Sequence, residues 1–507
     1  MSIPLPNPLL PGFNPDPSIV RVDGVYYLTT STFEYLPGLP VYRSTDFQTW
    51  TQIGNVASRP EQLGIGDVPT HLGVYAPTLR HHDGLFHLIV TILGGRGCVV
   101  FTAEDPAGEW SDGTVIQGLQ GIDPDLAWDA DGTAFLTYSG VVATEDGGQR
   151  GAILQVSVDL ATGTILDEPR ELWSGTGLKF PEAPHLYQRG SSWYLLIAEG
   201  GTERGHAVSI ARGDSPRGPF EGAPTNPVLS ARSTSRPIQN TGHADIVELP
   251  DGGDGMVLLG MRPLGRGQAY SILGRETFAT RVDWVDGWPV VEPVELRPRP
   301  SEVVFRDDFA AESFDPGWLA VRRTPAEVAS RSADELVLTA DRGDLDGRHP
   351  AFLGRRQNGV SSDVSVEVDV SQGTGGLSVR FDEQHHFDLE AEGTPTGNRL
   401  TARVRLAGLQ QTWTAELPAG PLLLRLASSP QEQVFPGDVA EAMTFTAAPV
   451  GDPDDVVTVA EIDGRYLSAE VVVSFTGRVV GPFCSAGTAT FRRFEQRATD
   501  SSEKDLS

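Results

Sequence analysis

The stretch NPDPSIVRVDGVYYLTT at residues 14–30 contains the pattern that decides the fold. An acidic residue precedes a short apolar run, a turn with glycine follows, and the next run is rich in aromatic and β-branched residues. Such runs favour β-strands, and Asp-Gly is a common pair in hairpin turns. The same module recurs four more times, with its turn glycine at positions 84, 132, 190 and 252.

The spacing of this module predicts a β-propeller. From Gly24 onward the turn glycines are separated by 60, 48, 58 and 62 residues. Propeller blades are four-stranded sheets of about 40 to 50 residues before loop insertions. We therefore expect a five-bladed β-propeller over residues 1–302. A set of ordinary hairpins is the alternative for any one module taken alone.

The residues before the turns indicate where a site could form. Counting back eight or nine residues from each glycine leads to Asp16, Ala76, Asp123, Glu182 and His243. The first strand of each propeller blade lines the central channel, so equivalent positions there face one another. Three carboxylates and one imidazole are thus predicted to converge on one cavity.

The composition agrees with an all-β chain and excludes some partners. The 57 glycines and 38 prolines among 507 residues disfavour long helices. A formal net charge of −29 repels phosphate backbones and anionic lipids, so we expect neither nucleic acid nor a membrane as partner. Two distant cysteines, Cys98 and Cys484, indicate no disulfide framework. The N-terminal MSIPLPNP lacks the features of a secretory signal, so we expect a cytoplasmic protein.

A second domain follows a Pro-rich, mixed-charge segment near residue 300. Alternation of apolar and polar residues is clear in SSDVSVEVDVS (361–371) and RLTARVRLAG (399–408). Alternation over short spans is typical of antiparallel sandwich strands. We expect a β-sandwich, a concanavalin-like jelly roll, over residues 303–495, and a flexible polar tail over residues 496–507.

Converging carboxylates point to cleavage of a glycosidic bond. One carboxyl protonates the leaving oxygen while another activates water or attacks the anomeric carbon. A third carboxylate nearby raises the pKa of the acid by repulsion and keeps it protonated. Asp16, Asp123 and Glu182 supply that number. As single residues, the two aspartates could be turn residues and Glu182 a solvated charge. Glu199 is a rival acid by composition but lacks the channel offset.

Eight ordered motifs resemble glycoside hydrolase family 43, specifically its β-xylosidases with a C-terminal sandwich. They are NPLLPGFNPDPSIVRVDGVYYLTTSTFEY, YRSTDFQTW, YAPTLRHHDG, GIDPDLAWDADG, FPEAPHLY, AEGGT, TGHADIVE and LGRETF. The resemblance implies that Asp16 is the general base, Glu182 the general acid, and Asp123 the residue that orients the acid and tunes its pKa. It also implies an inverting mechanism and an exo-acting pocket that removes a terminal xylose or arabinose.

The same resemblance implies further substrate-binding residues. Arg275 either corresponds to an arginine that binds sugar hydroxyls or is a surface arginine, and Phe33 either forms an aromatic wall or packs in the core. His243 either helps to hold a central ion through water or is simply hydrogen-bonded in the channel. Tyr75 stands where the family often has tryptophan, and Ala183 replaces a common glycine. Phe475, in DGRYLSAEVVVSFTG (463–477), either closes the propeller mouth or packs between sandwich strands.

The resemblance implies no required cofactor, although a structural calcium ion near the propeller centre stays open. The aspartates of DPDLAWDADG hint at a calcium loop but lack its bidentate glutamate. The motif DEQHHFD (382–388) could bind metal, but it is more often a polar sheet face. The expected substrate is a small xylo- or arabino-oligosaccharide, and a homo-oligomer stays open. The alternatives are an α-L-arabinofuranosidase, or a bifunctional enzyme, of the same family and, more remotely, a non-catalytic carbohydrate-binding propeller.

Overall fold

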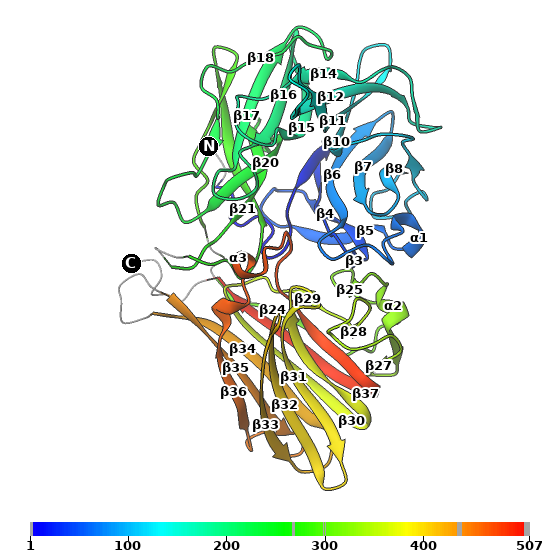
Figure 1. Ribbon diagram of the computed structural model, residues 1–507, viewed down its shortest axis with the longest axis vertical. Helices are drawn as coiled ribbons and strands as arrows, with labels where there is room; N and C mark the ends of the chain where they lie inside the picture. Colours follow the sequence, from blue (N-terminus) through cyan, green and yellow to red (C-terminus); the bar gives the residue numbers. More distant parts are fainter. Residues whose placement is uncertain (1–3, 266–268, 298, 300, 433–438, 501–507) are drawn as a thin grey trace.

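The computed structural model describes residues 4–265, 269–297, 299, 301–432 and 439–500, and it is nearly all β (Figure 1). A propeller and a sandwich, the two folds that the sequence predicts, lie one above the other in this view. The only helices among the described residues are short, namely α1 (Pro60–Leu63), α2 (Pro325–Val328), α3 (Ala469–Val472) and the 3-10 turn η1 (Gly464–Tyr466). None of them is long and apolar enough to span a membrane.

The propeller consists of five antiparallel sheets that follow one another along the chain. The first two blades are β1 (Ser18–Val22), β2 (Val25–Thr29), β4 (Gly38–Ser44) and β5 (Thr51–Ala57), then β6 (Gly73–His82), β7 (Leu85–Leu93), β8 (Gly97–Ala103) and β9 (Thr114–Val115). The third is β10 (Ile122–Trp128), β11 (Ala134–Ala143), β12 (Gln149–Asp159), β13 (Thr164–Ile165) and β14 (Arg170–Trp173). The last two are β15 (Glu182–Arg189), β16 (Ser192–Glu199), β17 (Ala207–Gly213), β18 (Glu221–Gly222) and β19 (Leu229–Ser230), then β20 (Gln239–Glu248), β21 (Asp254–Met261), β22 (Glu276–Val285) and β23 (Trp288–Val291).

Hydrophobic packing between neighbouring blades closes the ring. Each successive pair of blades shares one buried apolar cluster, and the cluster around Ile19, Tyr26 and Val257 joins the fifth blade to the first. The N-terminal segment adds backbone hydrogen bonds between Leu10 and Thr277 on β22. The innermost strands β1, β6, β10, β15 and β20 contact one another in turn and line the channel.

The sandwich is built around two long strands, β30 (Ser361–Arg380) and β37 (Val479–Thr499), which pair with each other along their length. β30 pairs with β34 in its first half and with β31 in its second half, so the two layers share these strands. The other strands are β24 (Val303–Asp307), β26 (Ala329–Ser332), β27 (Glu335–Thr339), β28 (Ala351–Phe352), β29 (Arg355–Arg356), β31 (His385–Thr394), β32 (Gly397–Leu406), β33 (Leu409–Leu417), β34 (Leu422–Glu432), β35 (Val439–Pro449) and β36 (Val457–Asp463).

The prediction of a flexible tail from residue 496 is wrong for its first five residues. β37 continues through Thr499, because Gln496 and its neighbours pair with β24 and β30. Asp500 is buried and accepts hydrogen bonds from Arg262 and Arg299. The prediction relied on the polar composition of the segment. In the structure its backbone is paired with neighbouring strands and Asp500 forms ion pairs, so the segment is ordered. Residues 501–507 lie outside the described residues.

The two domains are joined by a small sheet and a shared aromatic cluster. β25 (Ala320–Val321) of the sandwich pairs with β3 (Tyr35–Leu36) of the propeller. Phe13, Phe33 and Tyr35 pack in one buried cluster with Phe352 and Phe483 of the sandwich. Phe33 and Tyr75, two of the predicted substrate-binding residues, belong to or pack against this cluster, so the interface lies beside the predicted site.

Candidate active site

The channel residues share an unusual backbone conformation at the start of the innermost strands, with a bulge in four of the five blades. Asp16, Ala76, Asp123, Ala183 and His243 all have positive φ, between 44° and 55°. Strained φ values of this kind are rare for residues other than glycine and cluster at functional sites. The pairing register slips at these positions in β6, β10, β15 and β20, so an extra residue is accommodated there.

Glu182 does not occupy the position predicted by counting from the turn. The equivalent residue of the fourth blade is Ala183, and Glu182 precedes it, in the place that Tyr75 takes in the second blade. The cause lies in the hairpin. Gly24 and Gly84 are the second residues of their two-residue turns, whereas Gly190 is the first residue of its turn. Four of the five predicted positions are therefore equivalent, and the acid stands one residue earlier.

Asp16 is a buried, ionised carboxylate. Ser31 donates a hydrogen bond to Asp16 Oδ2 at 2.6 Å, and Arg275 Nη1 lies 3.1 Å from Oδ1. Burial alone would raise the pKa of Asp16, but the charge of Arg275 and the Ser31 hydrogen bond hold it below its ordinary value. Burial lowers the pKa of His243 to about 4, so its imidazole is neutral near pH 7. Arg275 is therefore the cation that keeps Asp16 charged.

The pKa values of Asp123 and Glu182 are raised, in contrast to that of Asp16. Burial, then repulsion from Asp16, raises the pKa of Glu182 to about 7, although Arg275 and Lys179 oppose the change. Burial, then repulsion from Glu182 and Asp16, raises the pKa of Asp123 well above its ordinary value. The backbone N–H of Ala183 donates to Asp123 Oδ2 at 3.1 Å and so ties the two blades together. The pair thus retains a proton near neutrality.

Aromatic residues from both domains surround Arg275. Phe33 is fully buried, and its ring lies 5.0 Å from Tyr75 and 6.0 Å from Phe475, centroid to centroid. The Arg275 guanidinium carbon lies 5.0 Å from the centre of the Phe475 ring. Arg275 Nε and Nη2 each donate to the carbonyl of Phe475 at 3.3 Å. Phe475 therefore lies at the propeller, 37% exposed, and not between sandwich strands.

Several residues of this neighbourhood were missed from the sequence. Thr202 accepts from Arg275 Nη1 at 3.2 Å, and its place in the AEGGT motif was the available signal. His71 Nδ1 lies 3.0 Å from Ser474 Oγ, next to Phe475, and its carbonyl accepts from the Tyr75 hydroxyl. Nothing in the sequence pattern marked His71 or Ser474, because their contacts cross the domain boundary.

A second buried ring lies two to four residues further along the innermost strands. Arg80 Nη2 lies 2.8 Å from Asp125 Oδ1, and Arg80 Nη1 lies 2.9 Å from Asp245 Oδ2. His185 Nδ1 lies 2.9 Å from Arg80 Nη2, and Tyr187 donates to Asp245. Each carboxylate of this ring faces the guanidinium, so the ring supports the site above it and leaves no free acid.

No group of three or more His, Cys, Asp or Glu residues is arranged to hold a metal ion within the part of the chain that the structure describes. Asp16, the carboxylate nearest His243, is paired with Arg275, and Arg80 stands between the carboxylates of the second ring. A second imidazole, His206, is buried near Asp16, and burial lowers its pKa to about 4. The calcium ion near the propeller centre and its link to His243 stay predictions.

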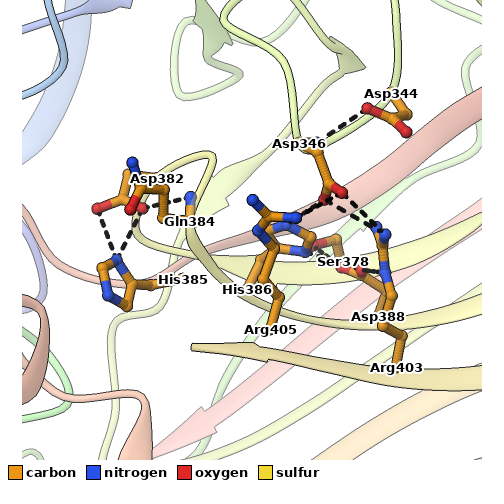
Figure 2. Close-up of polar contacts among 10 residues, drawn as sticks. All are labelled: Asp344, Asp346, Ser378, Asp382, Gln384, His385, His386, Asp388, Arg403 and Arg405. Carbon is orange, nitrogen blue, oxygen red and sulfur yellow. Dashed lines mark hydrogen bonds and ion pairs between the residues drawn. The ribbon is translucent and has the colours of Figure 1, made fainter. Parts of the chain in front are cut away.

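The other candidate motifs have structural roles. Figure 2 shows that the motif at 382–388 forms a polar network, in which His386 contacts Asp346 and Asp388 while His385 contacts Asp382. Arg403 also contacts Asp346 and Asp388, so these two acids already have a cationic partner. Glu199, the rival acid, is fully buried, and its carboxylate accepts hydrogen bonds from Thr176 and Ser209.

A five-bladed propeller whose channel combines an ionised carboxylate with a protonated one has the architecture of an enzyme that cleaves glycosidic bonds. Comparison with known proteins gives the family. Residues 5–289 match the model described as glycosyl hydrolases family 43, and residues 306–496 match the beta xylosidase C-terminal concanavalin A-like domain. The chain belongs to glycosyl hydrolase family 43.

Relatives cover both domains. A non-reducing end alpha-L-arabinofuranosidase of Bacteroides ovatus is 36% identical over 97% of this chain and 95% of its own. A xylan 1,3-beta-xylosidase of a Vibrio species is 32% identical over 79% of this chain and 81% of its own. The solved structure of a xylan beta-1,4-xylosidase from Bacillus halodurans superposes with a TM-score of 0.86 at 27% identity, over 97% of this chain and all of that one.

Proposed function

We propose that this protein is an exo-acting, inverting glycosidase that releases terminal β-D-xylose from xylo-oligosaccharides. The proposal rests on one observation: the pKa values of two carboxyls in the channel are shifted in opposite directions. Asp16 is held ionised beside Arg275, whereas burial raises the pKa of Glu182 to about 7. Inversion needs such a base and such an acid at the same time, on opposite faces of the sugar.

The proposed reaction is a single displacement. Asp16 takes a proton from a water molecule as its oxygen attacks the anomeric carbon. Glu182 gives its proton to the glycosidic oxygen as the bond to the leaving sugar breaks. In this proposal Asp123 acts through Glu182. The two carboxyls share a proton, and when Asp123 is the ionised partner its charge favours the protonated form of Glu182.

The surroundings of Arg275 support an exo-acting pocket. Phe33 and Phe475 cover the guanidinium from two domains, and Tyr75 packs against both rings. A pocket closed by aromatic side chains accommodates one terminal sugar and limits water around the scissile bond. In this proposal Arg275 grips sugar hydroxyls while it keeps Asp16 charged.

α-L-Arabinofuranosidase activity, alone or beside xylosidase activity, is the second candidate. The Bacteroides ovatus relative named for that activity matches nearly the whole chain. Tyr75 and Ala183 also depart from the common family pattern beside the acid, where they can alter the fit of a pentose ring. Cytoplasmic location and self-association likewise stay predictions.

Hydrolysis of nitrophenyl β-D-xyloside and nitrophenyl α-L-arabinofuranoside, measured side by side, tests the proposal. We expect turnover of the xyloside with the higher kcat/KM, and the proton NMR signal of α-xylose as the first product. A higher kcat/KM for the arabinofuranoside would favour the second candidate. β-Xylose as first product would contradict inversion, and sugar binding without turnover would indicate the non-catalytic alternative.

A further inference from the structure

His71 lies in the propeller loop between α1 and β6, and its side chain contacts the sandwich at two places. His71 Nε2 lies 3.2 Å from Asp382 Oδ2, and His71 Nδ1 lies 3.0 Å from Ser474 Oγ. Asp382 belongs to the turn between β30 and β31, whereas Ser474 precedes Phe475 in the segment that joins α3 to β37. One imidazole therefore bridges two parts of the sandwich that are far apart in the sequence.

The Asp382 end of this bridge is fixed within the sandwich. The carboxylate is buried, accepts a hydrogen bond from the backbone N–H of Gln384 at 2.7 Å, and lies 2.9 Å from His385 Nδ1 (Figure 2). Burial alone would raise the pKa of Asp382, but its contacts with His385 and His71 hold that pKa well below the ordinary value. Because an ionised carboxylate only accepts hydrogen bonds, it places a hydrogen of His71 on Nε2 and orients the imidazole ring.

The propeller loop that carries His71 is also held by the sandwich. Arg322 Nε donates to the Val68 carbonyl at 2.8 Å, and the Thr70 hydroxyl donates to the Glu383 carboxylate. His71 itself has a φ of 66°, in the left-handed region. Such a conformation is costly for a residue other than glycine and persists where the surrounding structure fixes it. The position of the imidazole is thus set by both domains.

The other end of the bridge reaches the aromatic pocket. Ser474 Oγ accepts from the Thr476 backbone N–H at 3.1 Å, so the hydroxyl is fixed within the segment that presents Phe475. The carbonyl of His71 accepts from the Tyr75 hydroxyl. The rings of Tyr75 and Phe475 lie 6.1 Å apart, edge to face. His71 therefore contacts the supports of two aromatic walls, one from each domain.

The contact with Ser474 does not require one protonation state of His71. Burial alone would lower the pKa of His71, but its contact with Asp382 and the charge of Glu34 raise it above the ordinary value. In the neutral imidazole Nδ1 accepts from the Ser474 hydroxyl, and in the imidazolium Nδ1 donates to the Ser474 oxygen. Both forms can keep the bridge intact.

We propose that His71 is a positioning residue that holds the Phe475 ring over Arg275 by means of Ser474. Asp382 acts one step further away, by orienting the imidazole. The inference rests on the proposed function, because its effect is on the pocket that receives the terminal sugar. Displacement of the ring would open this pocket to water and weaken its contact with the substrate.

A double-mutant cycle in the full chain tests the bridge. The kcat/KM for xylobiose, or for the pentoside that the wild type hydrolyses faster, is measured for His71→Ala, Ser474→Ala and the double variant. We expect each single variant to lose about two- to tenfold, the range for one hydrogen bond. The double variant should be no worse than His71→Ala, because both changes remove the same contact.

A second cycle asks whether His71 acts through the ring. In the Phe475→Ala background, the loss caused by His71→Ala should be at most about half as large as in the wild type, because the ring is already gone. Strain of alanine at a φ of 66° is common to both backgrounds and cancels. His349→Ala is the matched control and should stay within about twofold of the wild type. The His349 imidazole also crosses the domain boundary, to the Gly66 carbonyl, but no hydrogen bond or ion pair of the described residues joins it to residues 474–476.

A kcat/KM of His71→Ala equal to that of the wild type, with or without a fall in Tm, would overturn the proposal. Equal losses in the two backgrounds would do the same, because the role of His71 would then be only structural. If His71→Ala fails to fold, Ser474→Ala in the same two backgrounds decides by the same criterion.

Failure of the proposed function gives a different result. A wild type that binds pentosides without turnover would refute that function, and the Kd of xylobiose then replaces kcat/KM in both cycles with the same expected ratios. A wild type that neither hydrolyses nor binds pentosides would refute both proposals.

Discussion

Replacement of Phe475 by alanine tests the contribution of the sandwich to the pocket. The ring packs against Phe33 and Tyr75 and lies over Arg275. Each aromatic pair contributes about 0.5–1.5 kcal/mol, and an exposed cation–π contact about 0.5–1 kcal/mol. The ring is 37% exposed, so these contacts contribute less than their full sum. We expect removal of the ring to destabilise the closed pocket by about 2 kcal/mol. That loss corresponds to a decrease of about 30-fold in kcat/KM.

The assay combines kinetics with unfolding. Activity of Phe475→Ala on nitrophenyl xyloside and on xylobiose is compared with that of Tyr466→Ala, an exposed aromatic of the same segment without a ring contact to the propeller. We expect Tm to change by only about 2–4 °C in both variants, since opening one loop is a local event. A large fall in Tm with normal kinetics would refute the reasoning, because Phe475 would then belong to the core.

The other predictions concern the carboxyls and their cation. Asp16→Ala and Glu182→Ala should each lower kcat by about a hundredfold to ten-thousandfold. Glu203 is an exposed carboxylate nearby, and the kcat of Glu203→Gln should stay within a few-fold of the wild type. If either alanine variant keeps more than a few percent of the wild-type activity, the role assigned to that residue is rejected. In the wild type, kcat/KM should fall as pH rises through about 7, because Glu182 must be protonated, and fall again as pH drops below the ordinary Asp value of 3.8, because Asp16 must be ionised. Asp123→Asn should move the basic limb down by about one pH unit, as Glu182 loses a repulsive neighbour; an unmoved limb with lost activity would instead indicate that Asp123 binds the sugar. Arg275→Met should move the acidic limb up by about one to three pH units, because burial of Asp16 is then unopposed, and a profile identical to the wild type would contradict the ion pair.

Much of the fold and of the site follows from local sequence patterns. The turn glycines repeat, so the number of blades was predictable, and the offset from the turns located Asp16, Asp123 and His243. The same count was off by one at Glu182, because Gly190 begins its turn where Gly24 ends its own. Alternation predicted the sandwich, yet it did not indicate that residues 361–380 form one continuous strand, because glycines at 373, 375 and 376 interrupt the apolar pattern.

The rest depends on contacts between distant residues. Arg80 is separated by 165 residues from Asp245, its partner in the second ring. Arg275 and Asp16 are 259 residues apart, and only the resemblance to a family drew attention to that arginine. Ser474 and His71 are 403 residues apart and belong to different domains. No periodicity or spacing rule reports such pairs, since they arise from how the blades and the sandwich are assembled.

The sandwich orients Arg275 through a main-chain oxygen, the carbonyl of Phe475. The hydrogen bonds to Arg275 at position 475 are therefore independent of the side chain that covers the pocket there. Any amino acid placed there presents the same carbonyl, provided that the loop keeps its path, so the guanidinium can stay oriented while the side chain above it changes. Substrate preference can therefore be varied at a single codon without loss of the ion pair to Asp16. Saturation mutagenesis at this codon, followed by screening on pentosides of different ring size, is the direct route to enzymes with altered selectivity from this scaffold.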